Sequence, residues 1–315
     1  MKPILNKFKY SDDNKRYHTF NYYLKQTYHS KVCKVSLNAN FSCPNRDGKV
    51  GVGGCSFCSY LGSGDYAGKA NDSLSDQFVE ISQKLQQKWP DAKYIAYFQA
   101  YTNTYASLEI LKASYEPFVH KEKVVALAIA TRPDCLADET IAYLDELSNE
   151  IDIWLELGLQ TTHDEIAKDF NRGYDYQVFL DCLDKLAMTN LKVCVHLING
   201  LPNETYEMML DNVKKLNKLK IDAIKIHMLH VIKDSKLGED YLITPFKLLN
   251  LTEYVELVVH QLRYLRPELI VQRLTGDANK DNLLAPLWTL NKTKVLNSID
   301  KYMALHNYLQ GDLCE

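Results

Sequence analysis

Apolar residues recur in two alternating patterns along the first three quarters of the chain. Continuous or every-second apolar residues indicate strands, whereas apolar residues three or four positions apart indicate one face of a helix. Strands are predicted over residues 32–37, 94–99, 124–130, 151–159, 192–198 and 221–229. Helices are predicted over residues 74–89, 108–118, 139–147 and 176–187, and again after a cap at Thr205.

This alternation predicts an α/β fold. Strands separated by helices favour right-handed parallel crossovers, and six such units form most of a closed barrel. The predicted fold class is a partial (β/α)6 TIM-type barrel with N-terminal and C-terminal extensions; a doubly wound open sheet is the alternative. The barrel is expected over residues 32–243, after an extension of residues 1–31. Residues 244–315 form the second extension, with a helix over 251–264, a possible strand over 269–274 and a helical segment over 288–309.

Charge is distributed unevenly along the chain. The net charge is −3, which does not mark a nucleic-acid binder, but residues 1–34 carry eight Lys or Arg against two Asp and are therefore +6. Aromatic residues are interleaved with these bases over residues 8–29, a mixture that suits base stacking and phosphate contact. The alternative is an N-terminal helix that packs its aromatic side chains on the barrel.

Hydropathy and cysteine content bear on localisation. The first residues have no apolar run typical of a signal peptide, and the longest apolar run, 124–130, is far shorter than the roughly 20 residues that span a bilayer. Eight cysteines without secretory context favour reduced thiols, so a cytoplasmic protein without a membrane partner is expected. Five cysteines stand apart in the sequence and are expected to be small buried side chains. Of these, Cys33 is kept as a candidate fourth metal ligand.

The other three cysteines, Cys43, Cys55 and Cys58, lie in one glycine-rich stretch. A Cys-x-x-Cys pair by itself is compatible with redox chemistry or with zinc. A structural zinc site needs four protein ligands, whereas a reactive centre keeps one position open. Iron–sulfur clusters are usually held by four thiolates, so a cluster with three would expose one iron.

Polar residues follow the predicted strands, at the end where parallel barrels carry their functional groups. They lie at 99–103, 131–134, 160–163 and 199–204, and at His230; each is equally compatible with a cap or a turn. His196, His227 and His230 are expected to be hydrogen-bonded core or substrate contacts more often than metal ligands. Arg273 and Asp277 are candidates to close the substrate side, with a salt-bridged loop as the alternative.

The run Cys43-Pro44-Asn45-Arg46-Asp47-Gly48, followed by Gly51-x-Gly53-Gly54-Cys55-x-Phe57-Cys58, resembles the YhcC/YtqA branch of the radical S-adenosylmethionine (SAM) enzymes. The resemblance implies a [4Fe-4S] cluster held by Cys43, Cys55 and Cys58, with SAM on the open iron. Phe57 is the aromatic residue of the motif. One electron, from a reduced flavodoxin or ferredoxin-type donor, would cleave SAM and start hydrogen abstraction from the substrate.

The same resemblance implies contacts to SAM. The segment around Gln99 replaces the usual Gly-Gly-Glu type motif for the methionine amino group, and Thr131 and Asp134 would meet the ribose or methionyl part. Gln160 and Arg172 match positions that contact SAM, and Gly200 lies in the turn that packs near adenine. The predicted cofactor-binding residues are therefore Phe57, Gln99, Thr131, Asp134, Gln160, Arg172 and Gly200.

The branch is similar to the radical SAM half of the Elongator catalytic subunit, which implies tRNA as partner. The reaction implied is conversion of 5-carboxymethylaminomethyl-(2-thio)uridine to 5-aminomethyl-(2-thio)uridine at the wobble position. Two alternatives stay open. One is a radical SAM oxidoreductase acting on a small molecule or a protein, and the other is a zinc-stabilised RNA-binding module without turnover.

Overall fold

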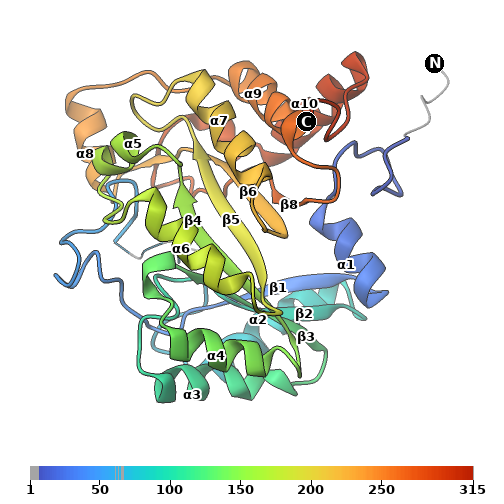
Figure 1. Cartoon of the computed structure of the whole chain (residues 1–315), viewed down its shortest axis with the longest axis vertical. Coiled ribbons are helices and arrows are strands. Elements are labelled where there is room, and N and C mark those ends of the chain that lie inside the picture. Colours follow the sequence, from blue (N-terminus) through green and yellow to red (C-terminus); the bar gives the residue numbers. More distant parts are fainter. Residues whose placement is uncertain (1–6, 61, 63, 65–66, 315) are drawn as a thin grey trace. The chain divides into compact units, whose positions relative to one another are not determined.

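The computed structural model describes residues 7–60, 62, 64 and 67–314. Its main sheet has seven strands in the order β1-β2-β3-β4-β5-β6-β8 (Figure 1). The strands are β1 (Val32–Leu37), β2 (Lys93–Phe98), β3 (Val124–Thr131), β4 (Asp152–Gln160), β5 (Lys192–Asn199), β6 (Ala223–Met228) and β8 (Ile270–Arg273). Two short strands, β7 (Val231–Ile232) and β9 (Leu283–Ala285), pair antiparallel to one another.

Helices fill most of the connections. They are α1 (Phe20–Tyr28), α2 (Leu74–Lys88), α3 (Leu108–Val119), α4 (Asp138–Leu147), α5 (Asp164–Asp169), α6 (Tyr176–Leu186), α7 (Tyr206–Asn217), α8 (Lys236–Ile243), α9 (Leu251–Tyr264) and α10 (Lys292–His306). Short 3-10 turns follow β3 at Pro133–Cys135 and precede α10 at Leu287–Leu290. The six predicted strands and the five helices predicted between them are confirmed, and each predicted bound lies within two residues of the observed one.

The strand order decides between the two topologies. A doubly wound sheet reverses its strand order at a switch point. Here β1 to β6 follow one another in sequence order, and the neighbouring pairs β1–β2, β2–β3 and β3–β4 are parallel. The partial TIM-type barrel is therefore confirmed. One detail differs from the expectation of six strands, because the short strand near residue 270 pairs parallel with β6 and adds a seventh.

The chain divides into two compact units. The first comprises Leu24–Leu159 and Phe170–Val195, and the second comprises Met1–Tyr23, Gln160–Asp169 and His196–Glu315. This division is not the one expected from the sequence, which placed boundaries after residues 31 and 243. The three-part organisation stays a prediction.

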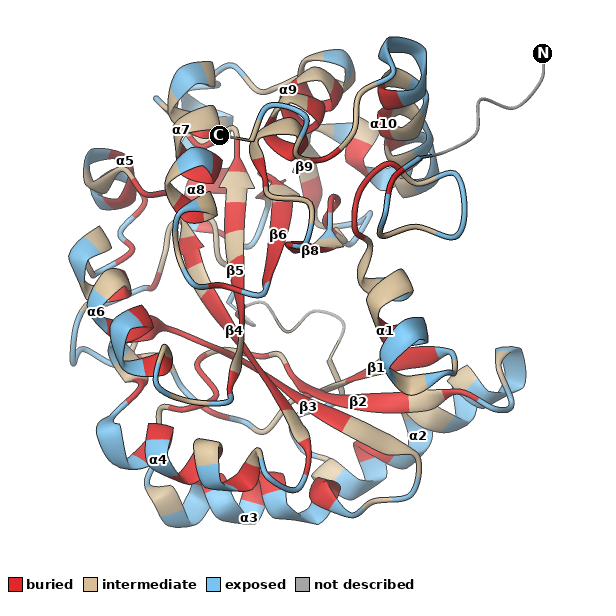
Figure 2. Cartoon of the chain, turned by 45° about the vertical axis from the view of Figure 1, so that its right-hand side comes forward, coloured by how far each residue is buried: buried red, intermediate tan, exposed pale blue. Residues whose placement is uncertain are grey.

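Buried strands dominate the core of the first unit. All but the first residue of β2 and the first two of β3 are buried, and α2, α3 and α4 lie along these strands (Figure 2). Strands that are apolar on both faces are typical of parallel sheets covered by other elements. Ser73 caps α2 by accepting a hydrogen bond from the Asp76 amide. The buried carboxylate of Glu156 is paired with Lys34 at 2.5 Å.

The second unit is built on α7, α9 and α10. Asn250 and Glu253 form a reciprocal capping box at the start of α9, and α9 and α10 lie side by side (Figure 1). Within this unit Thr19 bridges to Val271 of β8 in a parallel register. No helix of the described residues is long and apolar enough to cross a membrane.

Much of the basic aromatic segment is occupied by packing. Arg16 is 5% exposed and donates hydrogen bonds to Asn307 and to the Tyr308 carbonyl, and Lys15 pairs with Asp300 at 2.5 Å. The ring of Tyr17 is buried. The packing alternative therefore accounts for these residues, whereas Lys7 and Lys9 remain exposed. Residues 1–6 of the segment lie outside the described residues.

Candidate functional site

The loop that carries the three cysteines is folded by its own backbone. The Arg46 amide donates to the Cys43 carbonyl at 2.9 Å, and the Gly54 amide donates to the Asn45 carbonyl at 2.7 Å. The Arg46 guanidinium donates to the carbonyls of Ser59 and Tyr60 and so holds both ends of the loop. Gly54 has φ +84°, and a Cβ there would lie 2.8 Å from Arg46 Nε, so this position requires glycine.

The cysteine thiols influence one another. The Cys55 and Cys58 side chains share a hydrogen bond, which lowers the pKa of Cys55 and raises the pKa of Cys58 well above its usual value. Arg132, Asn45 and Arg172 also lower the pKa of Cys55, while the charge of Cys43 contributes to the high pKa of Cys58. Cys55 is therefore the thiol that this environment favours as a thiolate.

The donor set of three thiolates is one ligand short of a closed structural zinc site and fits an iron–sulfur cluster with one open iron. Among the described residues no three His, Cys, Asp or Glu side chains are grouped closely enough to hold one metal ion, as a tetrahedral zinc site requires. A cubane cluster is wider than one ion, so its thiolates do not converge on a point. Hydrogen bonds to the sulfur atoms and burial are the means by which proteins tune such clusters.

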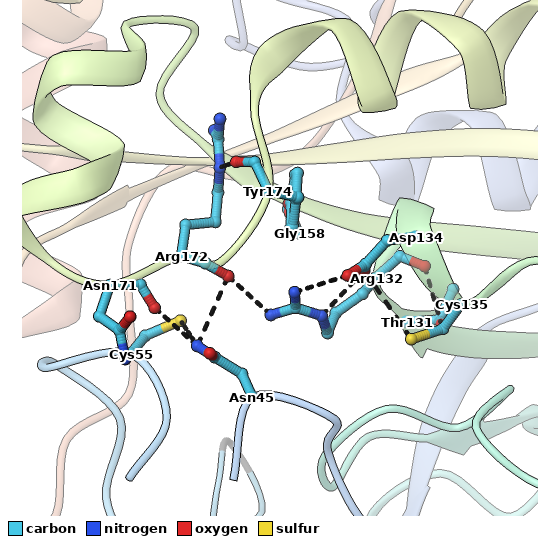
Figure 3. A network of polar contacts seen from close by, with 10 residues as sticks. All are labelled: Asn45, Cys55, Thr131, Arg132, Asp134, Cys135, Gly158, Asn171, Arg172 and Tyr174. Atoms are coloured by element: carbon cyan, nitrogen blue, oxygen red, sulfur yellow. Dashed lines mark hydrogen bonds and ion pairs between the residues drawn. The ribbon is translucent and has the colours of Figure 1, made fainter. Parts of the chain in front are cut away.

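Asn45 provides such a hydrogen bond. Its side chain is fully buried, and Nδ2 lies 3.8 Å from Cys55 Sγ and donates to the Asn171 carbonyl at 2.6 Å (Figure 3). Two glycines leave room for it, since a Cβ at Gly51 or at Gly173 would approach Oδ1 to 2.3 Å or 2.9 Å. Asn45 Oδ1 is buried and accepts no hydrogen bond from the described part of the chain. In the sequence Asn45 is one residue of the cysteine motif, and no role was predicted for it.

A second segment, residues 170–174, anchors the loop from the side. The Ser56 amide donates to the Phe170 carbonyl at 2.9 Å, and Asn171 Nδ2 donates to the Gly54 carbonyl at 2.9 Å. The Phe57 ring packs on the Phe170 ring with centroids 5.2 Å apart. Phe57 therefore contacts protein in this structure, and its contact with a cofactor stays a prediction.

Arg132 lies in the polar segment 131–134 that the sequence placed after a strand, but no role was predicted for it. Its guanidinium binds Asp134 through Nε at 2.9 Å and Nη2 at 2.8 Å, and Nη1 donates to the Arg172 carbonyl at 2.9 Å (Figure 3). Burial alone would lower the pKa of Arg132, but the hydrogen bonds and charge of Asp134 outweigh burial and raise it. The signal available in the sequence was an arginine placed directly after a buried strand.

Two predicted SAM contacts already have protein partners. Arg172 is 1% exposed and donates from Nε to the Tyr174 carbonyl and from Nη1 to the Leu159 carbonyl, each at 2.8 Å. Asp134 has both carboxylate oxygens on Arg132. These two residues position the loop 170–174 and Arg132, and their contact with SAM stays a prediction.

Thr131 and Gln99 follow the ends of β3 and β2. Thr131 is buried, with its hydroxyl 2.5 Å from that of Thr104, which in turn donates to the Cys135 carbonyl at 2.6 Å. The Gln99 amide donates to the Leu37 carbonyl at 3.1 Å, which ties the two strand ends together. Both lie in the same compact unit as the cysteines.

Gln160 and Gly200 belong to the other unit. Gln160 ends β4 with φ +65°, a left-handed conformation that is uncommon for a residue with a side chain and concentrates at functional sites. Its Oε1 is buried and no described residue donates to it. Gly200 has φ +84°, and its amide lies 3.1 Å from Met209 Sδ.

The structure argues against Cys33 as a fourth ligand. Cys33 is the second residue of β1, whereas the cysteine loop follows the opposite end of that strand. Burial raises the pKa of its thiol. Cys33 is therefore a buried side chain of the sheet, and the loop has three cysteines.

Glu204 follows Gly200 in the turn between β5 and α7. Burial raises the pKa of its carboxyl to about 7, although a hydrogen bond from Asn212 Nδ2 at 2.9 Å partly opposes the rise. The carboxyl thus binds a proton more tightly in the folded state than in the unfolded chain, where its ordinary pKa is 4.5. The stabilisation that comes from this tighter proton binding is complete below pH 4.5, and it is lost as the pH rises through about 7.

Glu204→Gln is therefore expected to become more stable than the wild type as the pH increases. The amide keeps an oxygen for Asn212 but does not titrate. The difference in free energy of unfolding between the two proteins should grow in favour of the variant from about pH 5 to about pH 8 in urea titrations. A difference that is independent of pH would show that Glu204 does not titrate in this range.

Comparisons with known proteins agree with this geometry. The model of the radical SAM superfamily matches residues 46–234, and the model of the radical SAM C-terminal domain matches residues 221–304. The chain is 44% identical to the uncharacterised protein YtqA of Bacillus subtilis, over 97% of this chain and 95% of that one.

More distant relatives cover less. The chain is 30% identical to the tRNA uridine(34) acetyltransferase of Methanocaldococcus infernus over 141 residues, which are 44% of this chain and 26% of that protein. The structure is similar in fold to Elp3 of the same archaeon, with a TM-score of 0.65 and 19% identity over 89% of this chain and 64% of that one. On these matches and on the loop of Cys43, Cys55 and Cys58, the chain belongs to the radical SAM superfamily, a family that uses a [4Fe-4S] cluster and SAM, and is similar to YtqA within it.

Proposed function

We propose that this radical SAM protein modifies the wobble uridine of tRNA, converting 5-carboxymethylaminomethyl-(2-thio)uridine to 5-aminomethyl-(2-thio)uridine. The observation that carries the reaction class is the loop with the half-buried Cys43, Cys55 and Cys58, in which Asn45 Nδ2 is directed at Cys55 Sγ and Arg132 and Arg172 add positive charge. The substrate class is supported by the partial match to an acetyltransferase of tRNA uridine 34.

In this proposal Cys43, Cys55 and Cys58 hold the cluster. Asn45 donates a hydrogen bond to one ligand sulfur, and Arg132 adds positive charge beside it. When bound, the cluster and SAM would supply the reductive cleavage of SAM and the abstraction of a hydrogen from the substrate; the two-carbon group would leave as glyoxylate, its methylene carbon oxidised at the expense of SAM and hydrolysed by water. Asn45, Arg132 and Arg172 are each less than 10% exposed, so these side chains keep water from the part of the loop that they cover.

SAM would contact Phe57, Gln99, Thr131, Asp134, Gln160, Arg172 and Gly200. Gln160 is the best supported of these, because its left-handed backbone and its buried Oε1, to which no described residue donates, are both costly without a ligand. Arg172 and Asp134 would act mainly by positioning Arg132.

The proposed partners are tRNA and a reduced flavodoxin or ferredoxin-type electron donor, in the cytoplasm. In the N-terminal segment the side chains of Lys7 and Lys9 are exposed and could contact phosphates. Lys15 and Arg16 serve the packing of the C-terminal segment instead. The contribution of this segment to tRNA binding is therefore expected to come from fewer cations than its sequence suggests.

The function is tested with anaerobically reconstituted protein, a chemical reductant, SAM and tRNA that carries the carboxymethylaminomethyl group. We expect 5′-deoxyadenosine to form and the aminomethyl nucleoside to appear in digests of the tRNA analysed by mass spectrometry. tRNA that already carries the aminomethyl group is the matched control. Formation of 5′-deoxyadenosine without any change in tRNA would favour another substrate, and a colourless, zinc-containing protein without iron would favour the binding module.

A further inference from the structure

A cluster of basic side chains lies in the second unit, apart from the cysteine loop in the sequence. We call the side chains of His196, His227, His230 and Arg273 the histidine–arginine cluster. The His196 and His227 rings are stacked with centroids 5.8 Å apart, and the charge of Arg273 acts on His227. Gly276 lets the loop after β8 approach His230, since a Cβ there would lie 2.6 Å from the imidazole Cε1.

Strand register brings these residues together. β6 and β8 are parallel neighbours in which Lys225 lies opposite Arg273. Because side chains alternate between the two faces of a strand, His227 shares the face of Lys225, two residues closer to the carboxyl end of β6. The carboxyl ends of the strands are where barrels of this type bind their ligands.

The imidazoles of His227 and His230 are neutral hydrogen-bonding groups. Burial lowers the pKa of His230 to about 4, although Asp277 partly opposes this, and burial together with Arg273 holds the pKa of His227 well below its usual value. A neutral imidazole offers one donor and one acceptor. Nε2 of His227 and Nε2 of His230 are both buried, and neither is hydrogen bonded to any residue that the structure describes. Buried polar atoms normally have a partner, so these two indicate a polar ligand.

The charge of the cluster comes from Arg273. Asp277 is its ion-pair partner, at 3.3 Å from Nη1, and within the described ranges we find no second one. Asp277 is shared, because its other carboxylate oxygen pairs with Lys292. Two cations thus face one carboxylate, and the Arg273 side chain is 41% exposed. A partly exposed guanidinium that shares its counterion with a second cation can bind a further carboxylate through two parallel hydrogen bonds.

These features select one class of ligand. A metal is disfavoured, because no three metal-ligating side chains among the described residues are grouped closely enough. The cluster offers Arg273, whose counterion Asp277 is shared with Lys292, and the neutral imidazoles of His227 and His230, a combination that suits a carboxylate on a polar group. We propose that the histidine–arginine cluster binds the carboxylate of the substrate's 5-carboxymethylaminomethyl group, with Arg273 on the carboxylate and His227 and His230 as hydrogen-bonding partners.

This inference rests on the proposed function. A binding experiment distinguishes a failure of the inference from a failure of the proposed function. Reconstituted protein with SAM, unreduced so that no turnover occurs, is titrated into fluorescent anticodon stem-loops that carry carboxymethylaminomethyluridine, aminomethyluridine or uridine. All three RNAs have the same phosphates and differ at one side chain. The wild type is expected to bind the carboxylate-bearing RNA about tenfold more tightly than the uridine RNA, the order expected of a hydrogen bond to a charged group.

Arg273→Gln is expected to lose this preference while its affinity for the uridine RNA stays unchanged. Arg273→Lys keeps the charge without the planar fork and should retain part of the preference. Arg263→Gln is the matched control, because Arg263 pairs with Asp312 at 2.7 Å in the same unit and lies outside the cluster. It should keep the full preference, and circular dichroism verifies that each variant is folded.

Three results would overturn the inference. If Arg273→Gln keeps the preference while the wild type converts its substrate, the assignment of the cluster is wrong and the proposed function stands. If Arg273→Gln weakens binding of all three RNAs equally, Arg273 contacts a phosphate. If the wild type shows neither preference nor conversion, the proposed function itself fails, and the carboxylate subsite with it.

Discussion

Cys55→Ala protein, reconstituted with iron and sulfide, is expected to lose its cluster and to form 5′-deoxyadenosine no faster than a mixture without protein. A [4Fe-4S] cluster held by three thiolates has one iron open to SAM. A loop with two thiolates is not expected to hold the cluster, so the reaction cannot start. Cys55 is chosen because the hydrogen bond from Cys58, the charges of Arg132 and Arg172 and the Asn45 amide all lower the pKa of its thiol. Iron content, the visible spectrum and 5′-deoxyadenosine are measured on the same sample.

Cys33→Ala provides the control for this experiment. Cys33 was the candidate fourth ligand from the sequence, and the structure places it at the other end of β1 from the loop. This variant is expected to keep wild-type iron content and product formation. Loss of iron in Cys33→Ala, or a complete cluster in Cys55→Ala, would refute the assignment of ligands.

Arg132→Met is expected to lower the free energy of unfolding by about 3–5 kcal/mol, the range found when one partner of a buried ion pair is removed. The Asp134 side chain is 16% exposed and has its oxygens on Arg132 Nε and Nη2, so the variant leaves a mostly buried carboxylate without a counterion. The carbonyl of Arg172 loses the shorter of its two hydrogen bonds as well and keeps the one from Asn45 Nδ2 at 3.5 Å. Urea denaturation of the anaerobic protein without cluster measures this loss independently of catalysis.

Two variants test the explanation. Arg132→Met combined with Asp134→Leu removes both charges and should recover part of the lost stability, because no buried charge is left unpaired. Lys236→Met breaks an exposed ion pair with Asp240 and should leave the free energy of unfolding nearly unchanged. An Arg132→Met protein that is as stable as Lys236→Met would contradict the role of Arg132 as a buried counterion.

The regular elements of the barrel were predictable because their signals are local. Strands such as β3 are continuous apolar runs, and helices such as α2 carry a capping residue and a periodic apolar face. The short helices α5 (six residues) and α8 (eight residues) have too few turns to show a period, and the sequence did not predict them. Strand β8, with four residues, was found, but its place in the main sheet was not.

The candidate site was predictable only where its residues lie close together in the sequence. The three cysteines form a motif within sixteen consecutive residues, so their grouping needs no tertiary information. Asn45 and Arg132 had to be seen in three dimensions, because their importance comes from contacts with residues 126 and 40 positions away in the chain. Arg16 shows the converse, since its charge suggested RNA binding until the structure placed it against Asn307.

The sequence by itself thus determined the class of fold, the metal-binding loop and the superfamily, because periodicity and motif spacing are properties of neighbouring residues. Only the tertiary structure decided which charges are buried, which donors face Cys55 Sγ and which imidazole nitrogens accept no protein partner among the described residues. These properties depend on desolvation and on distances across strands and loops, and residues far apart in the sequence set both of them.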